Sequence, residues 1–113
     1  MSVVVKRIYE PIGNKDGYRI LVDRLWPRGI KKENAEIDTW LKEVAPSTEL
    51  RKWFHGGEGN FAEFRKKYLA ELKENPALTD LKSLLKAHKK VTLLYASKDE
   101  GHNHAHILAD LLS

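Results

Sequence analysis

Two arginines and an aspartate follow an apolar run that is typical of a buried strand. The run ends at Val22, Asp23 and Arg24 come next, and Arg28 stands four residues later. Guanidinium groups form paired, charge-assisted hydrogen bonds with phosphate and carboxylate groups. The segment therefore predicts a site for an anionic ligand, with Asp23 as part of the site and Arg24 and Arg28 as its charge clamps. The alternative is that Asp23 holds Arg24 in an ion pair that only orients the loop.

The residues between the two arginines favour a constrained loop. Pro27 lacks a backbone donor and disfavours a helix at Trp26, and Gly29 gives the next turn conformational freedom. Trp26 is therefore presented by a loop, either as part of a ligand-binding surface or as a buried aromatic residue. Trp40 is expected in the core.

A second candidate segment, residues 97–104, lies between another apolar run and the last expected helix. It contains Ser97, His102, Asn103 and His104. Imidazole exchanges protons near neutral pH, so His102 and His104 are the candidate catalytic residues, and Ser97 and Asn103 are candidate ligand-binding residues. His104 also falls on the apolar face of the helix, where the competing interpretation is a partly buried histidine that is bonded to backbone.

Neither a metal nor a nucleotide cofactor is expected. His102 and His106 are four residues apart, a spacing that zinc sites use, but a third ligand is not evident and the chain has no cysteine. Gly56-Gly57-Glu58-Gly59 matches neither a Walker loop nor a dinucleotide-binding loop. His55 lies beside these glycines in an expected loop and could approach the site, but nothing in the sequence places it there.

Strands are the first elements that must position these residues. They are expected at Val3–Tyr9, Tyr18–Val22 and Val91–Ala96, where apolar and β-branched residues run together. The first two are joined by a turn-rich segment too short for a helical crossover, so they either pair as a hairpin or lie apart in the sheet. Residues 37–44 fit either a helix or a short strand after one helical turn.

Capping patterns place the helices. A short helix should begin at Ser47 or Thr48, and longer ones at Asn60, which forms a capping-box pattern with Glu63, and at Asn75-Pro76. A last amphipathic helix should follow residue 104. If the strands that hold Asp23 and Ala96 are parallel neighbours, both candidate segments meet at the carboxyl edge of the sheet, where ligands collect in open α/β folds.

Composition limits the class of protein. The 113 residues are 42% hydrophobic, enough for one domain with an ordinary core over residues 1–113. The absence of cysteine, of a secretory signal and of a long apolar span fits a cytoplasmic protein without membrane partners. The net charge of +4 favours anionic partners. The expected fold class is a small α/β domain with a mostly parallel sheet of three or four strands packed with helices; the oligomeric state is not predicted.

The chain resembles the DUF488 family, and more closely its small YeaO-like branch. The resemblance rests on these segments: Val22–Gly29, Ala45–Ser47, Leu50–Phe54, Phe64–Tyr68, Leu93–Asp99 and His102–Ala105. It implies an α/β domain with a further strand near Trp40, and the family is uncharacterised. The broader family often carries Cys-His-Arg where this chain has Asn103-His104-Ala105, and a second cysteine near Tyr95. A thiol mechanism is therefore not carried over, whereas Asp23, Arg24, His102 and His104 are matching positions.

Three functions remain open. The first is a small enzyme that acts on an anionic, phosphate-bearing substrate through His102 or His104. The second is a nucleic-acid-binding module, and the third is a non-catalytic ligand-binding or interaction protein. A ligand site ranks above nucleic acid because the sequence lacks interleaved basic and aromatic residues on one strand and lacks a helix-turn-helix pattern.

Overall fold

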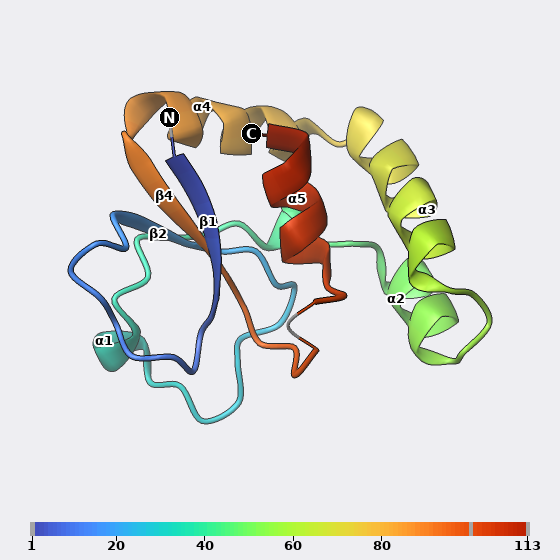
Figure 1. Cartoon of the computed structure of the whole chain (residues 1–113), viewed down its shortest axis with the longest axis horizontal. Coiled ribbons are helices and arrows are strands. Elements are labelled where there is room, and N and C mark those ends of the chain that lie inside the picture. The colour runs from blue at the N-terminus through green and yellow to red at the C-terminus, as the bar shows by residue number, and fades with distance from the viewer. Residues whose placement is uncertain (1, 100, 113) are drawn as a thin grey trace.

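The structure is a computed structural model that describes residues 2–99 and 101–112, so Met1, Glu100 and Ser113 lie outside the described residues. The described residues form one α/β domain with a parallel sheet, which confirms the expected fold class (Figure 1). The strands are β1 (Ser2–Arg7), β2 (Tyr18–Leu21), β3 (Thr39–Trp40) and β4 (Lys90–Tyr95). The helices are α1 (Lys32–Ala35), the 3-10 helix η1 (Lys42–Val44), α2 (Thr48–His55), α3 (Phe61–Lys73), α4 (Pro76–Ala87) and α5 (His104–Leu112).

The strands form one parallel sheet in the order β1-β4-β2-β3. The first two strands therefore do not pair with each other: each pairs with β4, which lies between them. A close contact fixes the start of β2, because Gly17 has a φ of 67° and a side chain there would lie 2.4 Å from the carbonyl oxygen of Lys90. Glycine accepts this conformation without the strain that other residues incur.

The segment that the sequence left open contains both short elements. One helical turn, α1, precedes the two-residue strand β3, which pairs with Ile20 and Leu21 of β2. The short-strand interpretation is therefore confirmed. A helix through residues 37–44 was the wrong alternative, although the 3-10 helix η1 does occupy its end.

The longer helices begin at the predicted capping residues. The Ser47 side chain accepts a hydrogen bond from the Leu50 amide, and Asn60 and Glu63 form the reciprocal capping box of α3. Asn75 caps α4, with Pro76 as its first residue. Within the described ranges, none of the helices is long and apolar enough to span a membrane.

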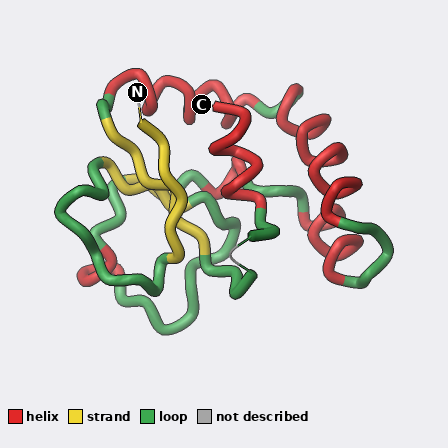
Figure 2. Tube along the Cα trace, viewed as in Figure 1, coloured by secondary structure: helices red, strands yellow, loops and turns green. Residues whose placement is uncertain are grey.

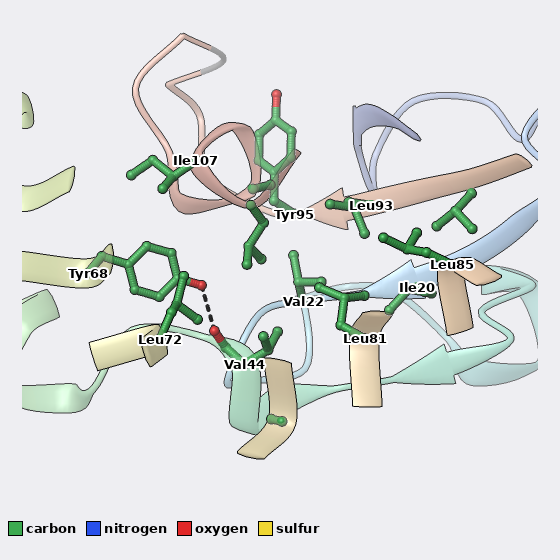
Figure 3. Packing of buried hydrophobic residues seen from close by; sticks show 14 of the residues in the cluster. Ile20, Val22, Val44, Tyr68, Leu72, Leu81, Leu85, Leu93, Tyr95 and Ile107 are labelled. Atoms are coloured by element: carbon green, nitrogen blue, oxygen red, sulfur yellow. Dashed lines mark hydrogen bonds between the residues drawn. The ribbon is translucent and has the colours of Figure 1, made fainter. Parts of the chain in front are cut away.

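The main core lies between the sheet and helices α2 to α5. Ile20, Val22 and Leu93 point from the strands into it, and they meet buried residues of the helices such as Leu81 (Figure 3). Tyr68 of α3 is also fully buried, and its hydroxyl donates to the carbonyl of Val44. Burial, and after it the nearby Glu71 carboxylate, raises the pKa of Tyr68.

Loops cover the opposite face of the sheet. Figure 2 shows long loops on one side of the strands and most helices on the other. Leu21 and Leu94 point to the loop side and form a smaller cluster with Ile8. Trp26 and Trp40 pack on this cluster edge to face, with ring centroids 5.3 Å apart, and remain partly exposed. Trp40, which the sequence predicted in the core, therefore packs at the edge of this smaller cluster and is only partly buried.

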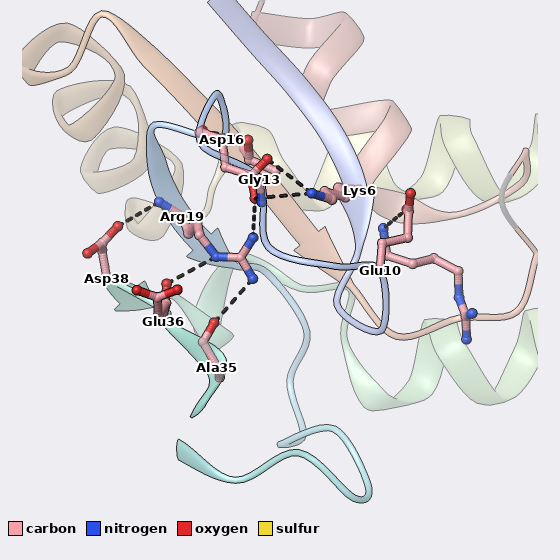
Figure 4. Close-up of polar contacts among 10 residues, drawn as sticks. Lys6, Glu10, Gly13, Asp16, Arg19, Ala35, Glu36 and Asp38 are labelled. Carbon is pink, nitrogen blue, oxygen red and sulfur yellow. Dashed lines mark hydrogen bonds and ion pairs between the residues drawn. The ribbon is translucent and has the colours of Figure 1, made fainter. Parts of the chain in front are cut away.

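A buried ion cluster lies on this loop-covered face. We use this term for Lys6, Asp16 and Arg19 (Figure 4). The Asp16 carboxylate accepts from both cations and from the Gly13 amide, while the Arg19 guanidinium also donates to the Ala35 and Glu36 carbonyls. Burial opposes ionisation of Asp16 most strongly, but these hydrogen bonds outweigh it and hold the pKa of Asp16 below 3.8.

Candidate functional site

A cavity of about 450 Å³ opens beyond the carboxyl ends of β2 and β4, which are parallel neighbours. Its lining comes from the loops after β1, β2 and β4, from the segment before α2, from α2 and α3, and from the start of α5. The lining residues are Tyr9, Asp23, Arg24, Leu25, Trp26, Pro27, Arg28, Ala45, Pro46, Arg51, Phe54, His55, Phe64, Ala96, Ser97, Lys98, His102, Asn103 and His104. The cavity thus brings together all the site residues that the sequence predicted.

Arg24 is anchored on one side only. Its Nη2 donates to the carbonyls of Ala45 and Pro46 at 3.1 and 3.3 Å, and its Nε lies 3.4 Å from the Pro46 carbonyl. Its Nη1 has no hydrogen-bond partner among residues 2–99 and 101–112, and no buried side-chain donor in those ranges is left unsatisfied. The remaining donors of Arg24 are therefore accessible from the cavity.

Asp23 forms no ion pair with Arg24 among the described residues, so the alternative interpretation of a structural Asp23–Arg24 pair is wrong. One carboxylate oxygen of Asp23 accepts from the Ala96 amide at 2.9 Å, and the other lies 3.3 Å from Nε2 of His104. The indole N–H of Trp40 donates to the Asp23 carbonyl at 2.7 Å. Asp23 therefore ties the end of β2 to the loop after β4 and to the first residue of α5.

His104 has hydrogen-bond partners at one ring nitrogen, Nε2, and none at Nδ1 among residues 2–99 and 101–112. Its Nε2 lies 2.9 Å from the Val22 carbonyl as well as near the Asp23 carboxylate. Both neighbours only accept hydrogen bonds, so Nε2 carries the proton and Nδ1 is the nitrogen that can exchange one. His104 is thus the partly buried, backbone-bonded histidine of the competing interpretation, and it also lines the cavity.

The other residues of the second candidate segment are hydrogen-bonded to one another. The Asp99 side chain accepts from the amides of His102 and Gly101, and the His102 hydrogen bond is the main reason that the pKa of Asp99 is lowered. Asn103 is buried, donates to the Asp99 carbonyl and accepts from the His106 amide at the start of α5. The Ser97 hydroxyl accepts from the Asp99 amide. Side-chain groups of Ser97 and Asn103 are therefore used to shape the loop; Glu100 in this segment lies outside the described residues.

Arg28 and Trp26 behave differently within the loop after β2. Arg28 is exposed, and its carbonyl accepts from the Tyr9 hydroxyl at 2.8 Å. The indole N–H of Trp26 donates to the Ile30 carbonyl at 2.7 Å and so closes the turn, where Gly29 has a φ of 81°. Trp26 thus fixes the loop and lines the cavity, whereas the Arg28 guanidinium makes no hydrogen bond or ion pair with other residues in the described part of the chain.

Sequence reasoning missed one wall of the cavity. Arg51 lies about one helical turn before Phe54 and His55 on α2, and all three line the cavity. Phe54 stacks on Phe64 of α3, with ring centroids 4.6 Å apart. The spacing of three and four residues in α2 was a usable signal that these side chains share a face, but it did not say that this face borders the loop after β2.

Arg7, also missed, holds the loop after β4. Its Nε donates to the Ser97 carbonyl at 2.9 Å and its Nη2 to the Ala96 carbonyl at 3.2 Å. The same guanidinium lies 5.0 Å from the centre of the Tyr9 ring. Arg7 therefore positions two lining segments without lining the cavity itself.

The cavity wall carries an excess of positive charge. Its cationic side chains are Arg24, Arg28, Arg51 and Lys98, and among the described residues Asp23 is the one carboxylate that lines it. No group of three or more histidine and acidic residues that could hold a metal ion occurs in the described parts of the chain. The lining therefore combines several cationic side chains with the imidazole of His104.

Comparison of the sequence with known protein families identifies the family to which this chain belongs. The sequence matches the family described as "Inactive DUF488-N3 subclade" (DUF488-N3i) over residues 2–113. The chain belongs to this family. The resemblance to the DUF488 family is thereby confirmed.

The relatives of this DUF488-N3i domain carry no functional name. The uncharacterized protein YeaO of Escherichia coli K12 is 50% identical over 112 residues, which cover 99% of this chain and 97% of that protein. The uncharacterized protein Rv3073c of Mycobacterium tuberculosis H37Rv is 43% identical over 111 residues, which cover 98% of this chain and 93% of that protein. No solved structure gives a significant match.

Proposed function

We propose that this protein binds a small anionic ligand, such as a phosphate-bearing molecule, in the cavity at the carboxyl edge of its sheet. One observation supports the proposal. The cationic side chains of the cavity wall belong to Arg24, Arg28, Arg51 and Lys98, and none of them has a carboxylate partner within residues 2–99 and 101–112. Like charges gathered around one volume raise the local concentration of counter-ions there. Asp23 does not neutralise them, because its carboxylate is already bonded to Ala96 and His104.

Binding is better supported than catalysis. The family description contains the word inactive, and the chain has no cysteine to act as a nucleophile. The hydroxyls on the cavity wall belong to Tyr9, which donates to the Arg28 carbonyl, and to Ser97, which accepts from the Asp99 amide. Within residues 2–99 and 101–112, His55, His102 and His104 line the cavity and each has a ring nitrogen without a hydrogen-bond partner, but a proton-transfer group without a nucleophile or a bound reactant does not define a reaction.

A titration of the protein with inorganic phosphate and with pyrophosphate, followed by backbone amide NMR at fixed ionic strength, tests the proposal. Shifts should concentrate in the loops after β2 and β4. Arg28→Ala should weaken binding about tenfold to hundredfold, because a charge-assisted hydrogen bond contributes roughly 1.5 to 3 kcal/mol. Thermal stability should change by less than about 0.5 kcal/mol, since the Arg28 side chain is exposed.

Arg65→Ala is the matched control. Arg65 is also an arginine, but it lies on α3 outside the cavity and faces Asp110 at 3.5 Å. This variant removes the same charge and should leave phosphate binding unchanged. Equal losses in the two variants, or shifts spread over the whole surface, would mean that the protein has no anion site here.

Nucleic acid is the competing anion, and a salt series separates it from a small ligand. Contacts to a phosphate backbone depend steeply on salt, and the excess of 20 basic over 16 acidic residues is modest. Labelled DNA and RNA should therefore bind weakly, without sequence preference, and detach at moderate salt. Tight, sequence-dependent binding that persists in moderate salt would replace the small-ligand proposal.

A further inference from the structure

We infer that the ligand of this cavity is an organic anion that joins a phosphate-type group to an aromatic ring. The inference rests on the proposed anion site and concerns the part of the ligand that the cations do not bind. It comes from three features of the wall: its volume, an exposed leucine, and the pairing of a cation with an aromatic ring on α2.

The volume is too large for an inorganic anion alone. Cavities that enclose organic ligands measure roughly 300 to 1,000 Å³, and this cavity of about 450 Å³ falls within that range. The cations explain only part of its lining. Leu25, Trp26, Phe54 and Phe64 contribute apolar surface to the same wall. The mixture of apolar and cationic groups is the usual composition of a site for an organic ion.

Leu25 is the most solvent-exposed of the apolar residues that line the cavity. It is 67% exposed, the highest value among the exposed large hydrophobic residues of the described chain. It stands between Arg24 and Trp26 in the loop after β2, so it is held beside the anchored arginine. An apolar ligand group next to the bound anion would remove this leucine side chain from water, which is favourable in proportion to the area covered.

The face of α2 places a ring beside a charge. Arg51 and Phe54 are three residues apart, so their side chains are neighbours on the helix surface. Phe54 is partly buried, and Phe64 stacks behind it with only 4% of its surface exposed. The Phe54 ring is therefore supported on one face by Phe64, which also lines the cavity. A ligand whose anionic group contacts the cations can place its own ring against Phe54.

Two kinds of molecule share this chemistry, namely aryl phosphates and nucleoside monophosphates, and pairs of probes distinguish them. Phenyl phosphate is compared with inorganic phosphate, and uridine 5′-monophosphate with ribose 5-phosphate, by the same amide NMR titration. Stacking on an aromatic side chain contributes roughly 1 to 3 kcal/mol, so a ring should strengthen binding at least about fivefold. The pair in which this gain is larger identifies the source of the ring.

Phe54→Leu tests the ring contact itself. Leucine keeps an apolar side chain but removes the aromatic face, so this variant should lose the gain from the ring and retain its affinity for inorganic phosphate. Phe61→Leu is the matched control: Phe61 belongs to the same aromatic cluster, with its centroid 6.1 Å from that of Phe54, but does not line the cavity. It should retain the gain. Phosphate affinity also reports whether either variant has disturbed the cavity.

The outcomes separate this inference from the proposal beneath it. If inorganic phosphate binds in an Arg28-dependent manner and neither ring-bearing probe binds more tightly than its ring-free counterpart, the ligand class is wrong while the anion site stands. Equal loss of the ring effect in Phe54→Leu and Phe61→Leu would also overturn the assignment of Phe54. If none of the probes shifts the cavity residues, the anion site itself fails.

Discussion

Arg19 lies within β2 and Arg24 in the loop that follows it, yet the two guanidinium groups differ in how many of their donors the fold uses. Arg19 is 4% exposed and donates to Asp16, Ala35 and Glu36 with Nη1, Nη2 and Nε. Among the described residues, Arg24 donates only through Nε and Nη2, to the carbonyl groups of Ala45 and Pro46. The charges of the buried ion cluster are paired with one another and with backbone groups, whereas the cations of the cavity wall can still pair with a ligand or with solvent.

The difference separates structural from functional charge. Burying a charge without partners costs free energy, and in Arg19 this cost is offset by Asp16 and the backbone carbonyls that surround the guanidinium. Cations that line an open cavity keep contact with water and do not incur this cost. Charged residues in the first setting should therefore affect stability and those in the second should affect ligand affinity.

Replacement of Arg19 with methionine should have the largest effect on stability. It would leave the Ala35 and Glu36 carbonyls without their donor and Asp16 with Lys6 as its remaining ion-pair partner. Breaking a buried pair costs roughly 3 to 5 kcal/mol, which urea unfolding will measure. Arg24→Met is the comparison and should cost less than about 1.5 kcal/mol. If both variants lose the same free energy of unfolding, Arg19 and Arg24 contribute equally to stability and the distinction between structural and cavity-lining arginines is wrong.

Replacement of Asp23 with alanine should have the second largest effect. Asp23 lines the cavity, but its carboxylate joins Ala96 and His104 and so belongs to the fold. Loss of hydrogen bonds to a charged group should lower the free energy of unfolding by roughly 1.5 to 3 kcal/mol. The surface aspartate Asp110, replaced in the same way, should change it by less than about 1 kcal/mol. A stable Asp23→Ala protein would show that the cavity wall, including this carboxylate, is not part of the scaffold.

The smallest of the three effects is a pH dependence of stability. The folded-state pKa of Asp16 lies below 3.8, so its ionised form stabilises the fold above that pH, and this stabilisation is lost as the pH falls through 3.8 towards the folded-state pKa. Urea unfolding of the native protein and of Asp16→Asn should therefore differ most near neutral pH. The difference should narrow in acid. A constant difference would mean that the Asp16 charge contributes nothing through ionisation.

Local patterns in the sequence predicted the elements, and one rule of α/β folds predicted the meeting of the two candidate segments. Capping at Ser47 and Asn60 depends on residues within one helical turn. The convergence of Arg24 and His104 followed from parallel strands that end at the same edge. Arg51 and Phe54 were missed because the orientation of α2 depends on packing against α3, which no short pattern encodes.

The buried ion cluster was missed for a different reason. Arg19 interrupts the apolar run from Tyr18 to Val22, and an arginine at that position of a central strand is a usable signal of a buried charge. Its partner Asp16 looked like an ordinary turn residue. The identity of Lys6 as a further partner depends on the parallel pairing of β1 with β4, which brings the two segments together.

The strand order also has a consequence for folding during synthesis. β1 and β2 leave the ribosome first, but each finds its main partner in β4, which begins at Lys90. Pairing over such a sequence distance carries a large loop-closure entropy and slows folding. The nascent chain therefore exposes β1 and β2 until residues 90–95 have been translated, and the cavity, whose lining includes the loop after β4, cannot be complete before then.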